Sequence, residues 1–306
     1  MEYYRLPKTD LEVSKIALGC MRIASKTEEE VDQLVHVALE QGINFFDHAD
    51  IYGAGKSEEL FGQVLAKQPF LRDKMVIQTK CAIRPGICYD FSGDYIVSCV
   101  EDSLRRLQTD HVDVLLLHRP DALCDPKEVA DTFDELHKSG KVKYFGVSNH
   151  TPLQMELLQK YSQYPLVANQ LQLSIVHSVM VDSGLNMNMT GEYAVDRDGG
   201  VLDYCRLHDI MIQAWSVVQA SWEDGTFINH PKYAKLNEEM EVLCEKYHTN
   251  KNAIALAWIL RHPAGIQPIL GTTSPVHLKE SLEALDFRLT REEWYKLYLS
   301  AGKPLP

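Results

Sequence analysis

Residues 43–52 read Ile-Asn-Phe-Phe-Asp-His-Ala-Asp-Ile-Tyr, a short apolar run that stops at an acid, Asp47, with Tyr52 just beyond it. A short apolar run bounded by polar residues is typical of a buried strand in a parallel sheet. We therefore interpret it as a strand whose carboxyl end presents a carboxylate and a phenol together.

Two later runs repeat this pattern. Met75–Thr79 ends at Lys80, and Val112–Leu117 ends at His118. In a closed parallel barrel all strand carboxyl ends open on the same face, and chemistry collects there. The three runs together predict that four side chains able to move or orient protons meet at one mouth.

Length and charge limit the class of protein. The chain has 306 residues, 45% of them hydrophobic, and a net charge of −12. An α/β barrel uses roughly 250 residues as one domain, so we expect a single domain over the whole chain, residues 1–306. The acidic balance argues against nucleic acid or an anionic membrane surface as the main partner, because both attract concentrated positive charge.

The seven cysteines are widely spaced, odd in number and without a Cys-x-x-Cys pair. This pattern indicates neither a disulfide framework nor a metal site. The amino terminus has no apolar signal region, and no apolar run has the length of a membrane span. We expect a cytoplasmic protein with reduced thiols.

Helix starts are well marked. Thr27 and Glu30 have the spacing of a capping box, and Gly42 stops the helix that follows. Three further starts place proline at the first helical position, where its missing N–H costs nothing: Asp125-Pro126, Thr151-Pro152 and Ser274-Pro275. Later helices are expected at about residues 57–67, 94–108, 126–139, 152–161, 200–208, 235–261 in two pieces, and 275–285.

Eight short apolar runs alternate with these helices. They are Ile16–Gly19, Ile43–Asp47, Met75–Thr79, Val112–Leu117, Val142–Val147, Leu166–Gln170, Ile210–Ala214 and Pro268–Leu270. Near-continuous apolar strands separated by helices favour a closed (β/α)8 barrel of the TIM type over an open doubly wound sheet. Residues 3–14 look like a β-hairpin, which we expect to cap the barrel bottom.

One segment, Ser174–Gly200, breaks the alternation. It is long, rich in Met and Asp, and follows the sixth strand, so it would project from the face that carries the chemistry. Loops of this length in compact domains are usually functional or disordered. We interpret it either as a substrate lid or as a plain surface insertion.

The four polar side chains at the mouth form a coherent chemical set. A free tyrosine has a pKa near 10, too high for efficient proton transfer near neutrality. A lysine ammonium beside the phenol lowers that pKa, and a carboxylate keeps the lysine charged and oriented. His118 could orient a substrate oxygen. Such a set protonates a carbonyl oxygen while hydride arrives at the carbon, or runs the same reaction in reverse. The alternative is that these are ordinary polar residues at strand ends, which is the simpler interpretation for any one of them alone.

Matching stretches along nearly the whole chain resemble the aldo-keto reductase family. They are Leu18–Arg22, Asn44–Gly53, Ile77–Lys80, Ser103–Leu107, Asp113–His118, Gly140–Asn149 and Ile269–Gly271. The resemblance implies a (β/α)8 barrel, carbonyl reduction with NADPH, and a small-molecule carbonyl substrate. It also implies that Tyr52 is the general acid/base, supported by Asp47, Lys80 and His118.

The same resemblance implies a set of cofactor contacts. Ser148, Asn149 and Gln170 would hold the nicotinamide carboxamide, and their mixed donors and acceptors suit an amide. Trp215 would stack on the nicotinamide, with core or rim packing as the alternative. The remaining implied contacts are Gly19, Cys20, Met21, Asp47, Ser216, Val217, Val218, Gly271, Thr272, Thr273, Ser274, His277 and Glu280.

The adenosine end departs from the family pattern. Family members often grip the 2′-phosphate with a lysine and an arginine, where this chain has Gly271 and His277. Hydroxyls and the helix start at Pro275 still suit a phosphate. We expect NADPH, with NADH possible, because the bidentate guanidinium is missing.

Little chain remains beyond the expected helix at 275–285 for the long carboxyl-terminal loop that shapes the pocket in some family members. The pocket is therefore expected to be open or built by Ser174–Gly200.

Two other functions remain as alternatives to a reductase: a non-catalytic nicotinamide-nucleotide-binding regulator on the same scaffold, or a structural barrel without nucleotide. We expect a monomer or a weak homo-oligomer.

Overall fold

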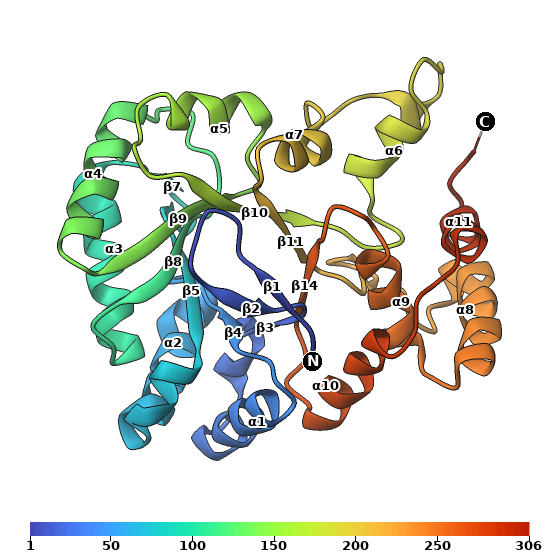
Figure 1. Ribbon diagram of the computed structural model, residues 1–306, viewed down its shortest axis with the longest axis horizontal. Coiled ribbons are helices and arrows are strands. Elements are labelled where there is room, and N and C mark those ends of the chain that lie inside the picture. The colour runs from blue at the N-terminus through green and yellow to red at the C-terminus, as the bar shows by residue number, and fades with distance from the viewer. Residues whose placement is uncertain (306) are drawn as a thin grey trace.

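A closed barrel of eight parallel strands forms the centre of the molecule (Figure 1). The structure is a computed structural model that describes residues 1–305, so the last residue of the expected domain lies outside the described part. The predicted (β/α)8 fold is confirmed. The barrel strands are β3 (Ala17–Gly19), β4 (Phe45–Asp47), β5 (Val76–Cys81), β8 (Val112–Leu117), β9 (Val142–Ser148), β10 (Leu166–Gln172), β11 (Met211–Trp215) and β14 (Gln267–Leu270).

Helices surround the barrel, and most begin where the sequence predicts. The Thr27–Glu30 capping box is present, and Asp125, Thr151 and Ser274 are the N-caps before their prolines. No helix within residues 1–305 has the length and apolar character needed to cross a membrane. The helices are α1 (Glu28–Glu40), α2 (Lys56–Lys67), α3 (Gly93–Leu107), α4 (Pro126–Lys138), α5 (Pro152–Gln159), α6 (Val179–Leu185), α7 (Val201–Leu207), α8 (Ala234–Tyr247), α9 (Lys251–Leu260), α10 (Pro275–Leu282) and α11 (Arg291–Ser300).

Alternation along β5 sorts its side chains between the barrel interior and the helix layer. Val76 belongs to the apolar cluster inside the barrel, whereas Ile77 belongs to the larger cluster beneath the helices. Thr79 points outward as well, and its hydroxyl donates to Glu58 of α2 at 2.6 Å. Because side chains alternate along a strand, Gln78 and Lys80 point into the barrel.

The amino-terminal hairpin, β1 (Tyr3–Arg5) and β2 (Glu12–Ser14), closes the barrel bottom as predicted. Leu6 and Val13 pack into the interior apolar cluster. The carbonyl of Ser14 accepts a hydrogen bond of 2.8 Å from Gln267 at the start of β14. Figure 1 shows the hairpin lying across the end of the barrel.

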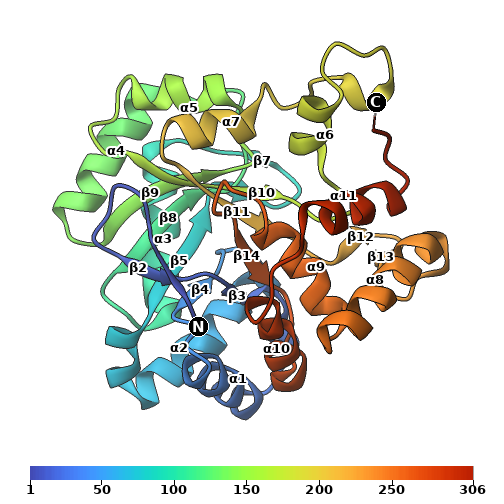
Figure 2. The same ribbon diagram turned by 45° about the vertical axis from the view of Figure 1, so that its right-hand side comes forward.

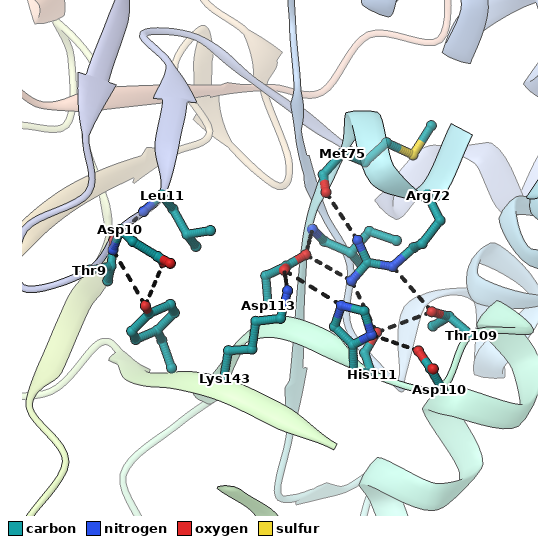
Figure 3. Close-up of polar contacts among 12 residues, drawn as sticks. Thr9, Asp10, Leu11, Arg72, Met75, Thr109, Asp110, His111, Asp113 and Lys143 are labelled. Atoms are coloured by element: carbon teal, nitrogen blue, oxygen red, sulfur yellow. Dashed lines mark hydrogen bonds and ion pairs between the residues drawn. The ribbon is translucent and has the colours of Figure 1, made fainter. Parts of the chain in front are cut away.

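A charged cluster ties the strands together at the same end (Figure 3). The buried carboxylate of Asp113 accepts hydrogen bonds from the Ile77 amide at 2.9 Å, from Arg72 at 2.8 Å and from Lys143 at 2.9 Å. The donors come from three different segments around β8. The cluster lies at the start of β8, whereas His118 follows the end of that strand, so it holds the barrel together away from the mouth.

The segment 174–200, interpreted from the sequence as a substrate lid or a plain surface insertion, is partly helical. It contains α6, and it packs against the carboxyl-terminal segment that follows α11 (Figure 2). The buried Lys303 ammonium lies 3.4 Å from both Asp182 oxygens and also donates to Ser178. Helix α11 itself was not predicted, although Thr290 and Glu293 form a capping box at its start.

Two short hairpins complete the structure. The first, β6 (Ile83–Arg84) with β7 (Cys88–Tyr89), follows the end of β5, and the second, β12 (Gln219–Ser221) with β13 (Gly225–Thr226), follows the end of β11. Both hairpins therefore rise from the carboxyl-end face of the barrel. They place apolar side chains near the mouth, which the sequence interpretation did not anticipate.

Candidate active site

The side chain of Lys80 joins the carboxylate and the phenol at the barrel mouth. Its ammonium donates to Asp47 Oδ2 at 2.8 Å, to the His48 carbonyl at 2.8 Å and to the Tyr52 hydroxyl at 3.0 Å. Lys80 is fully buried, with 0% of its surface exposed. A buried ammonium that uses all three N–H groups in this way is held charged and fixed in direction.

Amides complete the coordination of Asp47. Its Oδ1 accepts a hydrogen bond of 2.6 Å from Gln78 and one of 2.9 Å from Gln170, both of which are buried. The carboxylate therefore faces Lys80 with one oxygen and two amides with the other. This arrangement satisfies a buried charge that would otherwise be very unfavourable.

The amide of Gln78 begins a glutamine chain, Gln78, Gln213 and Gln267, that runs through the barrel interior. Gln78 donates to Gln213 Oε1 at 2.9 Å, Gln213 donates to Gln267 Oε1 at 3.0 Å, and Gln267 donates to the Ser14 carbonyl of the hairpin. All three side chains are fully buried. The chain connects the carboxylate at the mouth with the hairpin at the bottom of the barrel.

Burial sets the protonation state of Tyr52, and here the expectation from the sequence was wrong in sign. Burial raises the pKa of Tyr52 above its ordinary value of 10.0, and this effect outweighs the lowering by Lys80. Burial also opposes charging of Lys80, but Asp47 and Tyr52 together raise the pKa of Lys80 above 10.5. The site therefore holds a phenol that keeps its proton beside an ammonium that can stabilise the phenolate once the proton has been transferred.

His118 lies beside this pair. Its ring makes an edge contact with the Tyr52 ring, with centroids 6.1 Å apart. Burial, Lys80 and Arg119 lower the pKa of His118 to about 2, so the imidazole is neutral at physiological pH. A neutral imidazole retains one N–H, which can donate a hydrogen bond to a substrate oxygen without adding a charge.

A cavity of about 480 Å³ opens above these groups. This volume is in the range of small-molecule sites. Its lining includes Tyr52, Asp47 and His118, while Lys80 lies beneath the surface. None of residues 174–200 lines it, so this arrangement does not support the interpretation of that segment as a lid.

Most of the predicted cofactor residues line this cavity: Gly19, Met21, Asp47, Ser148, Asn149, Gln170, Trp215, Ser216, Val217, Val218 and Gly271. The exceptions are Cys20, Thr272, Thr273, Ser274, His277 and Glu280. Cys20 is buried, so its side chain is not available to a ligand. The others belong to the loop after β14 and to α10, where the Ser274 hydroxyl already serves as the helix cap.

The donors and acceptors in the cavity fit a nicotinamide nucleotide. Asn149 donates to the Ser148 hydroxyl at 2.8 Å and accepts from the Trp215 indole at 3.3 Å, so an amide pair and an aromatic ring lie together. Asn149 and Ser216 have positive φ angles of 60° and 57°. Such conformations cost about 1–3 kcal/mol each and concentrate at functional sites.

Sequence reasoning missed several cavity residues. Arg22 and Arg119 bring two guanidinium groups to the lining, and the two short hairpins contribute Ile83 and Trp222. Arg22 donates to the carbonyl of Gly271 at 3.0 Å, and Gly271 is the residue that stands where family members often have a lysine. Arg119 directly follows His118, so attention to both residues at the strand end would have found it.

Replacing Gln78 by leucine tests the glutamine chain. Gln78→Leu removes donors from Asp47 and Gln213, and we expect the free energy of unfolding to fall by about 1–3 kcal/mol because buried acceptors lose partners. Urea unfolding measures the change. Gln163→Leu is the control, since Gln163 makes its hydrogen bond to Asp134 at the surface. Equal stability of Gln78→Leu and the parent protein would contradict the role of the chain.

Comparison with known proteins identifies the class. The chain is 34% identical to the 6-dehydroglucose reductase of Novosphingobium aromaticivorans, with 99% of this chain and 97% of that protein covered. It is 33% identical to the oxidoreductase YdhF of Escherichia coli, with 95% and 94% covered. The chain is therefore an NAD(P)H-dependent oxidoreductase. A model of the aldo/keto reductase family matches residues 15–298, and the chain belongs to that family.

A solved structure agrees with this assignment. The crystal structure of a thermostable aldo-keto reductase, in complex with the inhibitor epalrestat, superimposes with a TM-score of 0.78 at 25% identity. The match covers 98% of this chain and 100% of the crystallised chain. The similarity extends over the whole barrel, including the strands that carry Asp47, Lys80 and His118.

Proposed function

We propose that this enzyme reduces aldehydes or ketones to alcohols with NADPH, and that Tyr52 donates the proton. The proposal rests on one observation: the Tyr52 hydroxyl lies 3.0 Å from the Lys80 ammonium at the floor of the cavity. Because burial raises the pKa of Tyr52, the phenol is protonated at neutral pH and available as an acid. We also propose that the barrel acts as one domain.

The four residues divide the proton chemistry among themselves. Tyr52 transfers its proton to the carbonyl oxygen as the substrate carbon becomes tetrahedral, and the phenolate that results is stabilised by the Lys80 ammonium. Asp47 holds the ammonium in place. His118 donates its N–H to the same carbonyl oxygen and orients it. A bound nicotinamide supplies the hydride that the carbon receives.

Residues of the lining are assigned to the cofactor on the basis of their chemistry. Ser148, Asn149 and Gln170 bind the carboxamide in this proposal, and Trp215 covers the ring. Arg22 places a guanidinium against Gly271, next to the loop that leads into α10. In this proposal the cation supplies positive charge to the adenosine end of the cofactor, where the 2′-phosphate distinguishes NADPH from NADH.

Titration with both nicotinamide cofactors tests the proposal. We expect NADPH to quench tryptophan fluorescence of the purified protein at lower concentration than NADH. We also expect NADPH absorbance to decay when a reactive aldehyde is added. Because two relatives are named for 6-dehydroglucose, sugar aldehydes belong in the first substrate panel. Binding without oxidation over a broad panel would favour the non-catalytic regulator, and absence of binding would contradict the proposal.

A further inference from the structure

Arg119 stands apart from the other arginines of the chain. Four arginines are half-buried, namely Arg72, Arg106, Arg119 and Arg261. The other three donate to carboxylates or to backbone carbonyls. The Arg119 guanidinium makes no hydrogen bond or ion pair within residues 1–305, although it lines the cavity. A partly desolvated cation without an acceptor is unfavourable, so a ligand that supplies one is strongly favoured there.

The charge balance of the cavity points the same way. Asp47 is the one carboxylate among the lining residues, and it is committed to Lys80 and to two amides. His118 is neutral, because burial, Lys80 and Arg119 lower its pKa to about 2. The uncompensated charges of the lining are therefore Arg22 and Arg119, both positive, in a chain of net charge −12. The lining of the cavity therefore carries net positive charge, although the protein as a whole is acidic.

The two guanidinium groups have different surroundings. Arg22 already donates to the Gly271 carbonyl at 3.0 Å, on the side of the cavity that leads to α10. Arg119 follows His118 and lies over the Trp215 ring, with Cζ 6.0 Å from the ring centroid. No residue in the described part of the chain accepts a hydrogen bond from the Arg119 guanidinium, so its N–H groups are available to a planar bidentate acceptor. Arg119 is therefore the cation available beside the proton-donating pair.

We propose that Arg119 binds an anionic group of the substrate, so that the enzyme acts on small aldehydes or ketones that carry a carboxylate or a phosphate. The inference rests on the proposed function, because it assumes that the carbonyl lies between Tyr52 and His118. The anionic group makes charge-assisted hydrogen bonds with the guanidinium, which give both affinity and orientation. The apolar side chains of Ile51, Ile83 and Trp222 line the rest of the cavity and suit the carbon skeleton.

Matched substrate pairs test the inference. Succinic semialdehyde is compared with butanal, and glyceraldehyde phosphate with glyceraldehyde, so that the two pairs separate carboxylate from phosphate recognition. We expect the parent enzyme to favour the anionic member of at least one pair in kcat/KM. In Arg119→Met the ratio of kcat/KM for the anionic substrate to kcat/KM for the neutral substrate is expected to fall by about tenfold to about 100-fold, mainly through KM, because charge-assisted hydrogen bonds are lost. Arg119→Lys keeps the charge, and its ratio is expected to lie between those of the parent enzyme and Arg119→Met.

The control is Arg105→Met, since Arg105 forms an exposed ion pair with Asp102 on α3, outside the cavity lining. This variant should keep the parent ratio. An equal loss of kcat/KM for both members of each pair in Arg119→Met would overturn the inference and assign Arg119 a structural role. A parent enzyme that favours the neutral members would overturn it as well.

A binding measurement separates this inference from the proposed function. Calorimetry compares succinate with succinamide, neither of which can be reduced, for the parent protein and for Arg119→Met. Succinate binding that depends on Arg119, without reduction of any aldehyde, would retain the anion site and reject the reductase. Reduction of neutral aldehydes without Arg119-dependent succinate binding would retain the reductase and reject the anion site.

Discussion

Tyr52→Phe is expected to lower the kcat of carbonyl reduction by about 10²-fold to 10⁴-fold, the usual contribution of a positioned general acid. Phenylalanine keeps the ring and removes only the hydroxyl that lies 3.0 Å from Lys80. NADPH binding should persist, because Tyr52 is not among the residues assigned to the cofactor. Steady-state kinetics and fluorescence titration measure the two properties separately.

Tyr144→Phe is the matched control for this change. The Tyr144 hydroxyl donates to Asp10 at 2.6 Å at the bottom of the barrel, so its removal should leave kcat unchanged. Unaltered turnover in Tyr52→Phe would reject the assignment of Tyr52.

Reduction needs the protonated phenol, and the pKa of Tyr52 is raised above 10.0 by burial. The reduction rate of the parent enzyme should therefore remain flat through neutral pH and decline only in strongly alkaline solution.

Lys80→Met is expected to lower the free energy of unfolding by about 3–5 kcal/mol, because it leaves the buried Asp47 carboxylate without its cation. The ammonium and both of its side-chain partners lie close together, at 2.8 Å and 3.0 Å, and the Asp47 and Lys80 side chains are buried. Turnover should disappear as well, since nothing then stabilises the phenolate formed from Tyr52. Urea unfolding and kinetics check the two losses.

The double variant Asp47→Asn/Lys80→Met shows whether the stability loss comes from a stranded charge. It removes both charges, so it should recover much of the stability lost in Lys80→Met, while turnover stays absent. Lys127→Met is the surface control, because the Lys127–Asp131 pair is exposed and contributes at most about 1 kcal/mol. A double variant no more stable than Lys80→Met alone would contradict the ion-pair explanation.

The barrel and the meeting of the four polar residues follow from local patterns in the sequence. Three apolar runs ended at Asp47, Lys80 and His118, and one topological rule placed their ends on the same face. The helix starts were equally readable, because a cap such as Thr27 acts through neighbours three residues away. Features of this kind depend on short stretches of chain and need no knowledge of distant contacts.

Features that depend on distant contacts could not be predicted in the same way. The pKa of Tyr52 is decided by how completely the surrounding segments cover it, and this burial outweighs the adjacent lysine. Segment 174–200 is held by Lys303, more than one hundred residues further along the chain. The inward direction of Gln78 did follow from strand alternation with Lys80, but its partners on other strands did not.

The glutamine chain inside the barrel has an evolutionary consequence. Each amide N–H donates to the carbonyl oxygen of the next side chain, from Gln78 to Gln213 and from Gln213 to Gln267. A change at any single position removes a hydrogen bond from its neighbours inside the barrel, and at the mouth Gln170 is the amide that still donates to Asp47 and to Gln213. We therefore expect descendants of a common ancestor to keep these glutamines together or to exchange them jointly for hydrocarbon side chains, with intermediate combinations rare among surviving lineages.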